Sequence, residues 1–465
     1  MSHVPTIVII GAGFSGAATA AQLLRQAAGQ RLRIVLVNES GRMARGLAYG
    51  THSARHVLNV PAGNMSALAD DPDNFVRYCR WSDPLVAPSD FVPRRFYGAY
   101  LEALLGAAEF SDTSVRLDRV VGRVRAVRPD ADHNRCVVEV SDAMAIEADH
   151  VVLAFGHFQP SDPLPAGVSA KLGSRYVPDP WGPDALSKIQ PEDKVLLLGT
   201  GLTAVDVALV LAQSDRSGQL MAVSRRGLWP QAHREGGAAA GAVDAQALRA
   251  RMGSTLRLQL RSFRRSLAEH QAQGGDWRDM VGALRSGTPA LWQAWSEIER
   301  ARFLRHLRPY WDTARHRCAP AAHAAFDSLR RSGTLSLHAA RVVDARPGAD
   351  GIEVVMRRRG ARECFSERVQ HVVNCTGPSS DLQRCRSSLV DGLLSRGLIV
   401  PDAPRLGIQV AADGALIDAE GRPSRLLSYI GPLLKARDWE ATAVPELRVH
   451  AQHLARRLTA ALQSG

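Results

Sequence analysis

Two segments of the chain share one hydrophobic pattern, in which an aliphatic run leads through glycines into a helical spacing of apolar residues. The first segment is IVIIGAGFSGAATAAQLL, from Ile7, and the second is KVLLLGTGLTAVDVALVL, from Lys194. Each predicts a buried strand, a tight turn and a helix, which is the context that makes a glycine-rich motif informative. The pattern therefore predicts two dinucleotide-binding units in one chain.

The rest of the chain shows other spacings of apolar residues. SVRLDRVVGRVRAVRP and CVVEVSDAMAIEADHVVLAFG alternate with a period of two, which predicts antiparallel ribbons. Residues 243–333 have apolar residues every three or four positions, which predicts helices, and a second ribbon is predicted over 334–357. The last predicted element is an amphipathic helix from about Val444. The predicted fold class is α/β, with two Rossmann-like domains and a helical insertion.

The glycines of the two segments have the spacing of dinucleotide-binding turns. The G-x-G-x-x-G/A positions are Gly11, Gly13 and Gly16 in the first segment, and Gly199, Gly201 and Ala204 in the second. Two such turns imply two dinucleotides, so we expect electrons to pass from one to the other.

The end of the next strand distinguishes the two predicted sites. RIVLVNES contains Glu39, whose carboxylate can accept hydrogen bonds from ribose hydroxyls. QLMAVSRRG contains Arg225 and Arg226, whose guanidinium groups can pair with a 2′-phosphate. The first site is therefore predicted to bind FAD and the second NADPH, with a solvated arginine pair as the alternative for Arg225 and Arg226.

The order of the segments predicts that one domain is inserted into the other. Two strands with small residues at their ends, VVLAFG (Val151–Gly156) and VVNCTG (Val372–Gly377), flank the second unit. Glycine at a strand end lets the chain approach a cofactor closely. We expect residues 1–160 and 372–465 to form a discontinuous FAD-binding domain, and residues 161–371 to form an NADPH-binding domain that contains the helical segment 243–333.

Composition limits the expected partners and compartment. The chain of 465 residues has a formal net charge of +12, from 58 Lys and Arg and 46 Asp and Glu. The arginines are scattered, so genome composition and two polyanionic cofactors account for this charge better than nucleic-acid binding does. No apolar run approaches the roughly 20 residues of a membrane span, and the first strand begins near Thr6. We expect a cytoplasmic protein that binds neither nucleic acid nor membrane.

Several further motifs resemble a known superfamily. They are GLAYG (Gly46–Gly50), HVLNVPAGNMSA (His56–Ala67), FVPRRFYGAYL (Phe91–Leu101), VPDPW (Val177–Trp181), SRRGLWPQAHR (Ser224–Arg234) and GPLLKARDWEATAVPELR (Gly431–Arg448). Over essentially its whole length, the chain resembles a bacterial family of FAD/NAD(P)-binding proteins related to flavin-containing and N-hydroxylating monooxygenases. The resemblance implies an FAD domain and an NADPH domain, but no particular substrate.

The chain departs from motifs of related enzymes in two ways, and these departures limit the reactions that the resemblance implies. Baeyer–Villiger enzymes carry F-x-G-x-x-x-H-x-x-x-W-P between their domains, whereas this chain has LGSRYVPDPWGP, which keeps Trp181 but lacks the phenylalanine and histidine. The six cysteines include no C-x-x-C pair and no zinc spacing. Ketone oxidation and dithiol chemistry are therefore disfavoured, and no metal is expected.

The resemblance also implies residues near the flavin. The loop with Asn59 and Met65 is implied to pass beside the flavin ring, although an Asx-turn is an alternative for Asn59. A helix after Gly431 and Pro432 is implied to point its N-terminus at the flavin. No catalytic side chain is predicted. The predicted FAD contacts are Gly11, Gly13, Phe14, Ser15, Gly16, Glu39, Asn59, Met65, Gly156, Gly377, Gly431 and Pro432, and the predicted NADPH contacts are Gly199, Gly201, Ala204, Arg225 and Arg226.

The sequence leaves two interpretations open for two further groups of residues, and it favours one interpretation for a third group. Arg94 and Tyr97 could contact a cofactor or a domain interface, or belong to an amphipathic helix with Tyr97 inward. The polar cluster Tyr310–Arg317 could approach substrate or the nicotinamide end of NADPH, but a charged helix face with Tyr310 and Trp311 buried is favoured. His233 and Arg234 are expected in a surface turn.

The leading hypothesis is an NADPH-dependent FAD monooxygenase. Its flavin hydroperoxide would transfer one oxygen from dioxygen to a nucleophilic nitrogen or sulfur of a small molecule, with N-hydroxylation favoured. The alternatives are an NADPH:acceptor flavin oxidoreductase that inserts no oxygen, and a non-catalytic redox protein that binds FAD and NADP. The sequence predicts neither the substrate nor the oligomeric state.

Overall fold

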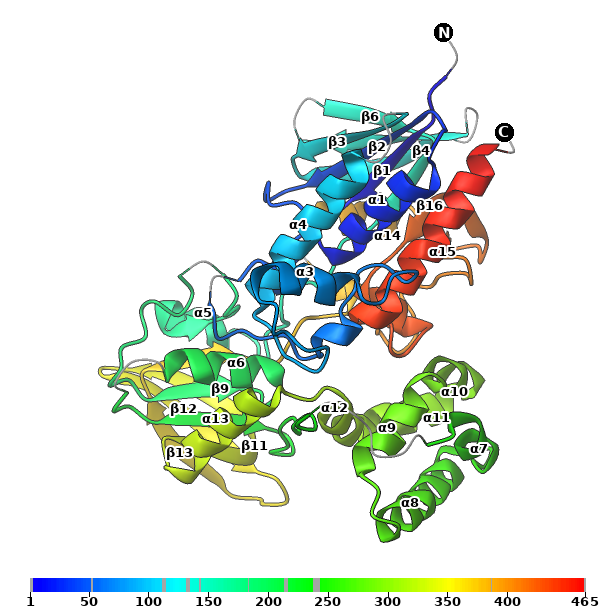
Figure 1. Ribbon diagram of the computed structural model, residues 1–465. Coiled ribbons are helices and arrows are strands. Elements are labelled where there is room, and N and C mark those ends of the chain that lie inside the picture. The colour runs from blue at the N-terminus through cyan, green and yellow to red at the C-terminus, as the bar shows by residue number, and fades with distance from the viewer. Residues whose placement is uncertain are drawn as a thin grey trace.

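The computed structural model describes residues 3–51, 53–110, 114–130, 134–141, 144–182, 184–212, 216–236, 243–385 and 387–463. Figure 1 shows an upper lobe that holds both termini, a lower lobe around a second sheet, and a smaller lobe of helices beside it. We call these the first unit, the second unit and the helical lobe, which spans residues 245–315. No helix among the described residues is long and apolar enough to cross a membrane.

The first unit is built on a six-stranded sheet with the strand order β15-β16-β7-β1-β2-β3. β1 lies in the middle and pairs in parallel with β2 and β7. Its residues Ile7, Val8 and Ile9 are fully buried, as expected for a parallel strand covered on both faces. α1 packs against both α4 and α15, and the antiparallel sheet β4-β5-β6 shares the same hydrophobic core.

The elements of the first unit come from two stretches of the chain. The N-terminal stretch contains β1 (Thr6–Ile10), α1 (Phe14–Gln26), β2 (Leu32–Asn38), α2 (Gly46–Tyr49), η1 (Ala62–Asn64), α3 (Asn74–Ser82), α4 (Arg94–Phe110), β3 (Val115–Val121), β4 (Val124–Asp130), β5 (Arg135–Val140), β6 (Met144–Ala148) and β7 (His150–Leu153). The C-terminal stretch contains η4 (Leu382–Arg384), α14 (Ser388–Ser395), β15 (Ala415–Ile417), β16 (Pro423–Tyr429), η5 (Pro432–Ala436) and α15 (Val444–Gln463).

The second unit has a seven-stranded sheet with the order β13-β12-β11-β10-β9-β14-β8. Alternate residues of β9 face opposite sides, so Val195 and Leu197 join one hydrophobic core and Leu196 and Leu198 join the other. Its elements are α5 (Val168–Leu172), η2 (Gly173–Arg175), β8 (Tyr176–Val177), β9 (Val195–Leu198), α6 (Leu202–Leu211), β10 (Leu220–Ser224), α13 (Pro320–Arg331), β11 (Leu335–Gly348), β12 (Gly351–Arg358), β13 (Cys364–Val369) and β14 (His371–Asn374).

Two strand predictions are wrong. The strand of VVNCTG was expected to return to the first unit, but β14 pairs in parallel with β9 and β8, so it closes the second sheet. The first unit therefore resumes after β14, where Leu382 enters its core, rather than at residue 372. The second error concerns β3, predicted in an antiparallel ribbon, which pairs in parallel with β2 because α4 carries the chain across between them.

The helical lobe interrupts the second unit in sequence but is attached to the first unit. The indole nitrogen of Trp292 donates a hydrogen bond to the carbonyl of Ala436 at 2.9 Å, and its ring lies 4.8 Å from that of Trp439. Its elements are α7 (Ala245–Ala250), α8 (Leu256–Ala272), α9 (Trp277–Arg285), α10 (Thr288–Ala294), α11 (Glu297–Arg302), the π-helical turn η3 (Phe303–Leu307) and α12 (Arg308–Arg315).

Candidate functional site

The first position of each predicted turn must be glycine, because the end of a neighbouring strand passes too close to leave room for a side chain. Gly11 has φ +105° and Gly199 has φ +118°, a region that glycine adopts readily. A Cβ atom on Gly11 would lie 2.7 Å from the carbonyl oxygen of Ala154, and one on Gly199 would lie 2.4 Å from that of Cys375. The end of β7 therefore lies against the first turn, and the end of β14 lies against the second.

The second glycine of each turn leaves space at a helix N-terminus. Gly13 precedes α1 and Gly201 precedes α6, and neither helix has a side-chain cap. A Cβ on Gly13 would come no closer than 3.6 Å to another residue, and one on Gly201 would meet nothing within 4 Å. Unpaired backbone N–H groups with open space before them fit the pyrophosphate of a dinucleotide.

The rest of each turn is closely packed. Phe14 and Ser15 begin α1 and are buried, as is Gly16. A Cβ on Gly16 would lie 1.9 Å from the carbonyl oxygen of Gly11. Ala204 takes the corresponding position of the second turn and is also fully buried. These residues therefore shape the turns.

The predicted strand-end residues lie where the pattern placed them. Glu39 follows β2 and accepts a hydrogen bond from Nε of Arg123 at 3.0 Å. Arg225 follows β10 with its side chain exposed, and it forms no ion pair with a described carboxylate. Arg226 is held instead, because it donates to the carbonyl of Arg305 at 2.9 Å. Of the two arginines, Arg225 is therefore the better placed to meet a phosphate.

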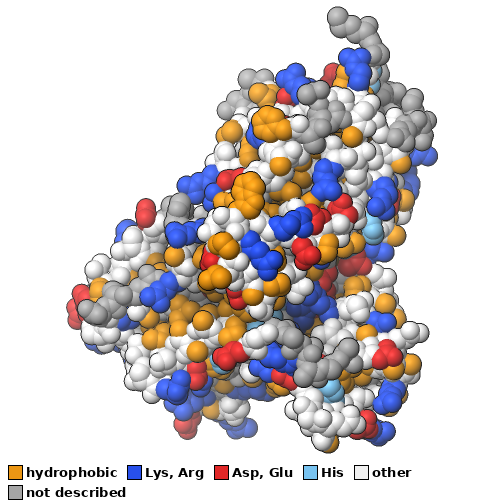
Figure 2. All heavy atoms as spheres, in the orientation of Figure 1, with side chains coloured by type: hydrophobic (Ala, Val, Ile, Leu, Met, Phe, Trp, Pro, Cys, Tyr) orange, Lys and Arg blue, Asp and Glu red, His pale blue; other side chains and the backbone are white. Residues whose placement is uncertain are grey.

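Both turns open into one cleft of about 1770 Å³. Figure 2 shows basic side chains in the hollow where the lobes meet. The cleft is lined by most of the predicted contacts of both cofactors, by residues of α12 and by the segment that leads into α15, whereas Gly16, Ala204 and Gly431 do not line it. Among the predicted residues that line it are Gly11, Gly13, Phe14, Ser15, Glu39, Asn59, Met65, Gly156, Gly377, Pro432, Gly199, Gly201, Arg225 and Arg226.

The segment from Gly431 to α15 closes one end of the cleft. Gly431 has φ +147°, and a Cβ there would lie 2.6 Å from the hydroxyl of Tyr429, so no larger residue fits. Pro432 is buried and lines the cleft, as do Thr442 and Val444 at the start of α15. The 20-residue helix α15 thus directs its N-terminal partial positive charge to the cleft, as the resemblance implied.

The placement of Gly377 differs from the prediction. It follows β14, whose end packs against Gly199. This strand belongs to the second unit, so the reason for assigning Gly377 to the first cofactor is lost. Gly377 does line the shared cleft, beside the second turn.

A buried ion pair joins the two units at the floor of the cleft. Nη2 of Arg94, on α4, lies 2.7 Å from Oδ2 of Asp206 on α6, and both side chains are about one-tenth exposed. Nε of Arg94 donates to the carbonyl of Val57 at 2.9 Å. Both interpretations of this helix are correct, because Arg94 makes a domain contact while Tyr97 is buried. The sequence analysis missed Asp206, although a single acid in an apolar helix was a usable signal.

His233 joins the same interface. Its Nε2 atom lies 2.8 Å from the carbonyl oxygen of Asn59, so the predicted surface turn is wrong. Burial, together with the charge of Arg317, lowers the pKa of His233 to about 4. The imidazole is therefore neutral at neutral pH and donates to the loop expected beside the flavin.

The polar cluster Tyr310–Arg317 forms one wall of the cleft. Tyr310 is 48% exposed, which contradicts the expectation that it is buried. Asp312, Arg315 and Arg317 line the cleft. Nε of Arg315 lies 2.9 Å from Oε2 of Glu440, just before α15. The interpretation that the structure supports is therefore the one in which this segment faces the cleft.

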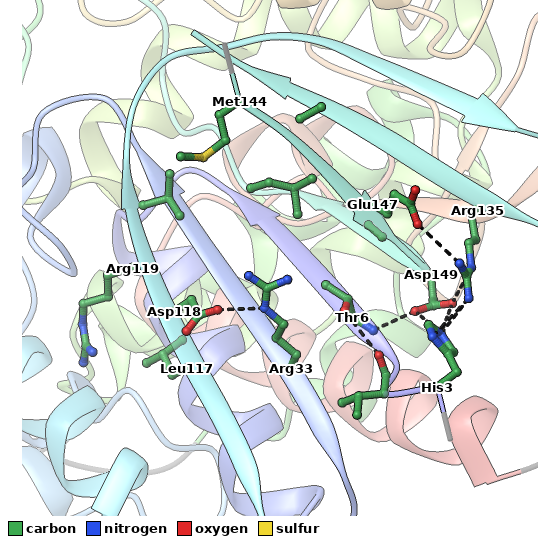
Figure 3. A pocket seen from close by; sticks show the side chains of 15 residues that line it. His3, Thr6, Arg33, Leu117, Asp118, Arg119, Arg135, Met144, Glu147 and Asp149 are labelled. Atoms are coloured by element: carbon green, nitrogen blue, oxygen red, sulfur yellow. Dashed lines mark hydrogen bonds and ion pairs between the residues drawn. The ribbon is translucent and has the colours of Figure 1, made fainter. Parts of the chain in front are cut away.

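A second pocket of about 670 Å³ lies away from the glycine turns (Figure 3). It is formed by β3, β6 and the N-terminal residues. Its charged residues are paired with one another, as in Arg33–Asp118 at 2.7 Å and His3–Asp149 at 2.8 Å. It therefore presents no unpaired group comparable with those of the cleft.

Comparison with known proteins agrees with this architecture. Residues 8–158 match a family model described as FAD-NAD(P)-binding, which covers the first glycine turn. No curated protein sequence matches the chain. The match agrees with the prediction of dinucleotide cofactors.

Solved structures share the fold over the full length. Ornithine hydroxylase (PvdA) from Pseudomonas aeruginosa has a TM-score of 0.66 at 15% identity, with 99% of this chain and 100% of that chain covered. Ornithine N-hydroxylase (KtzI) from Kutzneria sp. 744 has 0.63 at 16%, with 100% of both chains covered. Bacillithiol disulfide reductase (YpdA) from Staphylococcus aureus has 0.56 at 13%, with 99% of both covered. The predicted fold class, with two Rossmann-like units, is confirmed.

Proposed function

We propose that this protein is an NADPH-dependent FAD monooxygenase that transfers one oxygen atom from dioxygen to a nucleophilic nitrogen or sulfur of a small molecule, with N-hydroxylation favoured. The observation that carries the proposal is the single cleft into which both glycine turns open. Two dinucleotides in one cleft can meet at their reactive ends, which is what hydride transfer between them requires.

The residues present fit the two cofactors. The space in front of Gly13 and the carboxylate of Glu39 suit the pyrophosphate and ribose of FAD, and Gly201 with Arg225 suits NADPH. Bound NADPH would supply a hydride, and bound FAD would supply two-electron chemistry and reaction with dioxygen.

The protein itself positions the reacting groups and excludes water. The Arg94–Asp206 pair fixes the α4 side of the cleft relative to α6. The N-terminus of α15 stabilises negative charge that develops beside it. Apolar residues cover the same end of the cleft and keep water out; among them are Leu406, Leu433 and Leu447.

The basic wall supports the preference for nitrogen. An amine attacks as a nucleophile only in its neutral form. Arg317 and Lys435 line the cleft and have no carboxylate within ion-pair distance among the described residues, and nearby positive charges lower the pKa of a bound amine. Hydroxylases of ornithine are among the proteins that share this fold, which agrees with this preference.

Turnover with and without oxygen tests the proposal. The purified protein is mixed with NADPH and a panel of amines and thioethers, and NADPH oxidation, oxygen uptake and hydroxylated product are measured together. We expect equal consumption of NADPH and oxygen, with one product molecule for each. Turnover that continues without oxygen when a quinone is added would establish the acceptor-oxidoreductase alternative instead. Absence of flavin reduction by NADPH would leave the non-catalytic alternative.

A further inference from the structure

Four arginines gather between α9, α12 and the start of α15, and one of them has no acidic partner. Burial there makes an unpaired charge costly, so each arginine is expected to have a counter-charge. The pairs are Arg278–Asp276 at 3.1 Å, Arg285–Glu446 at 2.6 Å and Arg315–Glu440 at 2.9 Å. Arg317 has no carboxylate within ion-pair distance among the described residues.

The surroundings of Arg317 leave its guanidinium available to a ligand. It lines the cleft, its charge lies 5.9 Å from the ring of Trp277, and its buried Nε atom has no hydrogen-bond partner among the described residues. The nearest acid in its field, Asp276, is already shared by Arg234 and Arg278. Burial, followed by the charges of Arg315 and Arg278, lowers the pKa of Arg317 to about 10, so the group stays charged at neutral pH.

Arg315 provides a second unused donor beside it. Its side chain is 9% exposed and its charge is balanced by Glu440, yet its buried Nη2 atom donates to no described acceptor. Buried polar atoms are almost always hydrogen-bonded in native proteins. Two unsatisfied guanidinium donors on the wall of one cleft therefore indicate an acceptor that the protein does not supply.

The phosphates of the cofactors do not provide that acceptor. The pyrophosphates fit the N-termini of α1 and α6, and the 2′-phosphate fits Arg225. α12 begins beside Arg226, which contacts Arg305 and the ring of Tyr310. Its eight residues carry the chain about 12 Å farther, so Arg317 lies at the opposite end of the helix, near Glu440 and α15.

The same end of α12 adjoins the loop that the resemblance places beside the flavin. Cys318 donates its N–H to the carbonyl of Gln231 at 2.9 Å, and His233 in the same strand-like segment contacts Asn59. Arg317 therefore lies where a third molecule would meet the reactive ends of both cofactors.

We propose, building on the proposed function, that the substrate carries a carboxylate in addition to its nucleophilic nitrogen, and that the guanidinium of Arg317, with the free Nη2 of Arg315, binds this carboxylate. The substrate class is thus an amino acid rather than a simple amine. Arg317 is the residue that determines this specificity.

Calorimetric binding of matched pairs to the protein loaded with FAD and NADP⁺ tests the proposal. In each pair one member has a carboxylate that the other lacks: L-ornithine and 1,4-diaminobutane, and L-lysine and 1,5-diaminopentane. A charge-assisted contact contributes about 10- to 100-fold in affinity. We therefore expect at least one pair in which the acid-bearing member binds about tenfold or more tightly than its partner.

Three variants separate charge from structure. Arg317→Gln should abolish the preference for the carboxylate, and Arg317→Lys should retain part of it. Arg278→Gln is the matched control, because Arg278 lies on the same Trp277 ring but is paired with Asp276. It should keep the preference.

The possible outcomes distinguish this inference from the proposed function. Flavin content and the rate of flavin reduction by NADPH report on the proposed function, and they are compared between the wild type and Arg278→Gln, because Arg278 does not line the cleft. Equal binding of both members of every pair, or no binding of any member, would overturn the carboxylate site while leaving cofactor chemistry intact. A drop in FAD content or NADPH affinity in Arg317→Gln would assign this arginine to a cofactor and also overturn it.

Discussion

The two glycine turns have nearly the same backbone, but the chain surrounds them differently. In the first unit another segment lies close to the turn, since a Cβ on Gly13 would be 3.6 Å from Cα of Gly46. In the second unit, nothing lies within 4 Å of the corresponding position on Gly201. The difference suits a first cofactor that stays bound and a second that enters and leaves.

The residues at the two strand ends, Glu39 and Arg225, also suit a first cofactor that stays bound and a second that enters and leaves. Both side chains are exposed, but Glu39 is hydrogen-bonded to Arg123, which orients its carboxylate before any ribose binds. Arg225 has no described ionic partner. A side chain that is already oriented favours tighter binding than one that must be ordered each time a ligand arrives.

Glutamate at the second glycine of each turn should separate the two roles completely. Gly13→Glu and Gly201→Glu place a negative side chain where a pyrophosphate is expected, while the backbone has room for the Cβ. We expect Gly13→Glu to be folded but colourless, because FAD is not retained. We expect Gly201→Glu to be yellow, but its flavin should not be bleached by NADPH.

Absorbance of the flavin and circular dichroism of the protein check both variants. Dithionite, which reduces flavin without a binding site, serves as the control for Gly201→Glu and should bleach it normally. A yellow Gly13→Glu protein with full flavin content would refute the assignment of the first turn.

Substitutions at the third position of the two turns, Gly16 and Ala204, should have the next largest effect, which is on the free energy of unfolding. Gly16→Ala puts a methyl group 1.9 Å from the carbonyl of Gly11, so the turn must move. We expect a loss in unfolding free energy of about 3 kcal/mol, the upper end of overpacking costs. The reverse change in the second turn, Ala204→Gly, should cost only about 1 kcal/mol, through helix propensity.

Urea denaturation of the two variants measures this contrast. Because Ala204 already carries a methyl group at the equivalent position, equal losses in both variants would mean that the two turns pack alike. The inference that the turn is packed more tightly at Gly16 than at Ala204 would then fail.

The sequence predicted the parts of the molecule that depend on local pattern. Both strand–turn–helix units, the helices of 245–315 and the start of α15 were expected from periodicity and glycine spacing. Each is built from residues close together in the chain, where apolar period and turn chemistry determine structure.

The errors concern contacts between distant residues. VVLAFG and VVNCTG have similar local patterns, so nothing in either segment shows that β7 joins the first sheet and β14 the second. Arg94 and Asp206 are 112 positions apart, and the local pattern around each residue identifies no partner. The partner that makes them a buried pair is known only once the units are placed together.

Substitution of Arg225 should reduce the preference for NADPH over NADH, and we expect this effect to be intermediate in size. Arg225→Ala removes an exposed arginine, so the NADPH Michaelis constant should rise about 10- to 100-fold, as expected for a lost charge-assisted contact of about 1.5–3 kcal/mol. NADH use should not change. Arg226→Ala is the matched control, because Arg226 is held by Arg305 and Tyr310, and its effect should be smaller and equal for both nucleotides.

Steady-state kinetics with NADPH and NADH measure both constants. An equal rise for the two nucleotides in Arg225→Ala would show that this arginine is structural. The open second turn would then lack its expected selectivity for the 2′-phosphate.

The smallest expected effect is acid sensitivity at the join between the two units. His56 is buried against Trp181, and burial, with the charge of Arg94, lowers the pKa of His56 to about 4. The ordinary value of about 6.5 applies once the chain unfolds, so the unfolded state binds one more proton than the folded state between these two values. Stability from this residue is therefore complete above about pH 6.5 and is lost as the pH falls towards 4. His56→Gln should lose less in melting temperature than the wild type between about pH 7 and pH 5. If the two proteins lose the same amount, His56 does not make the join sensitive to acid.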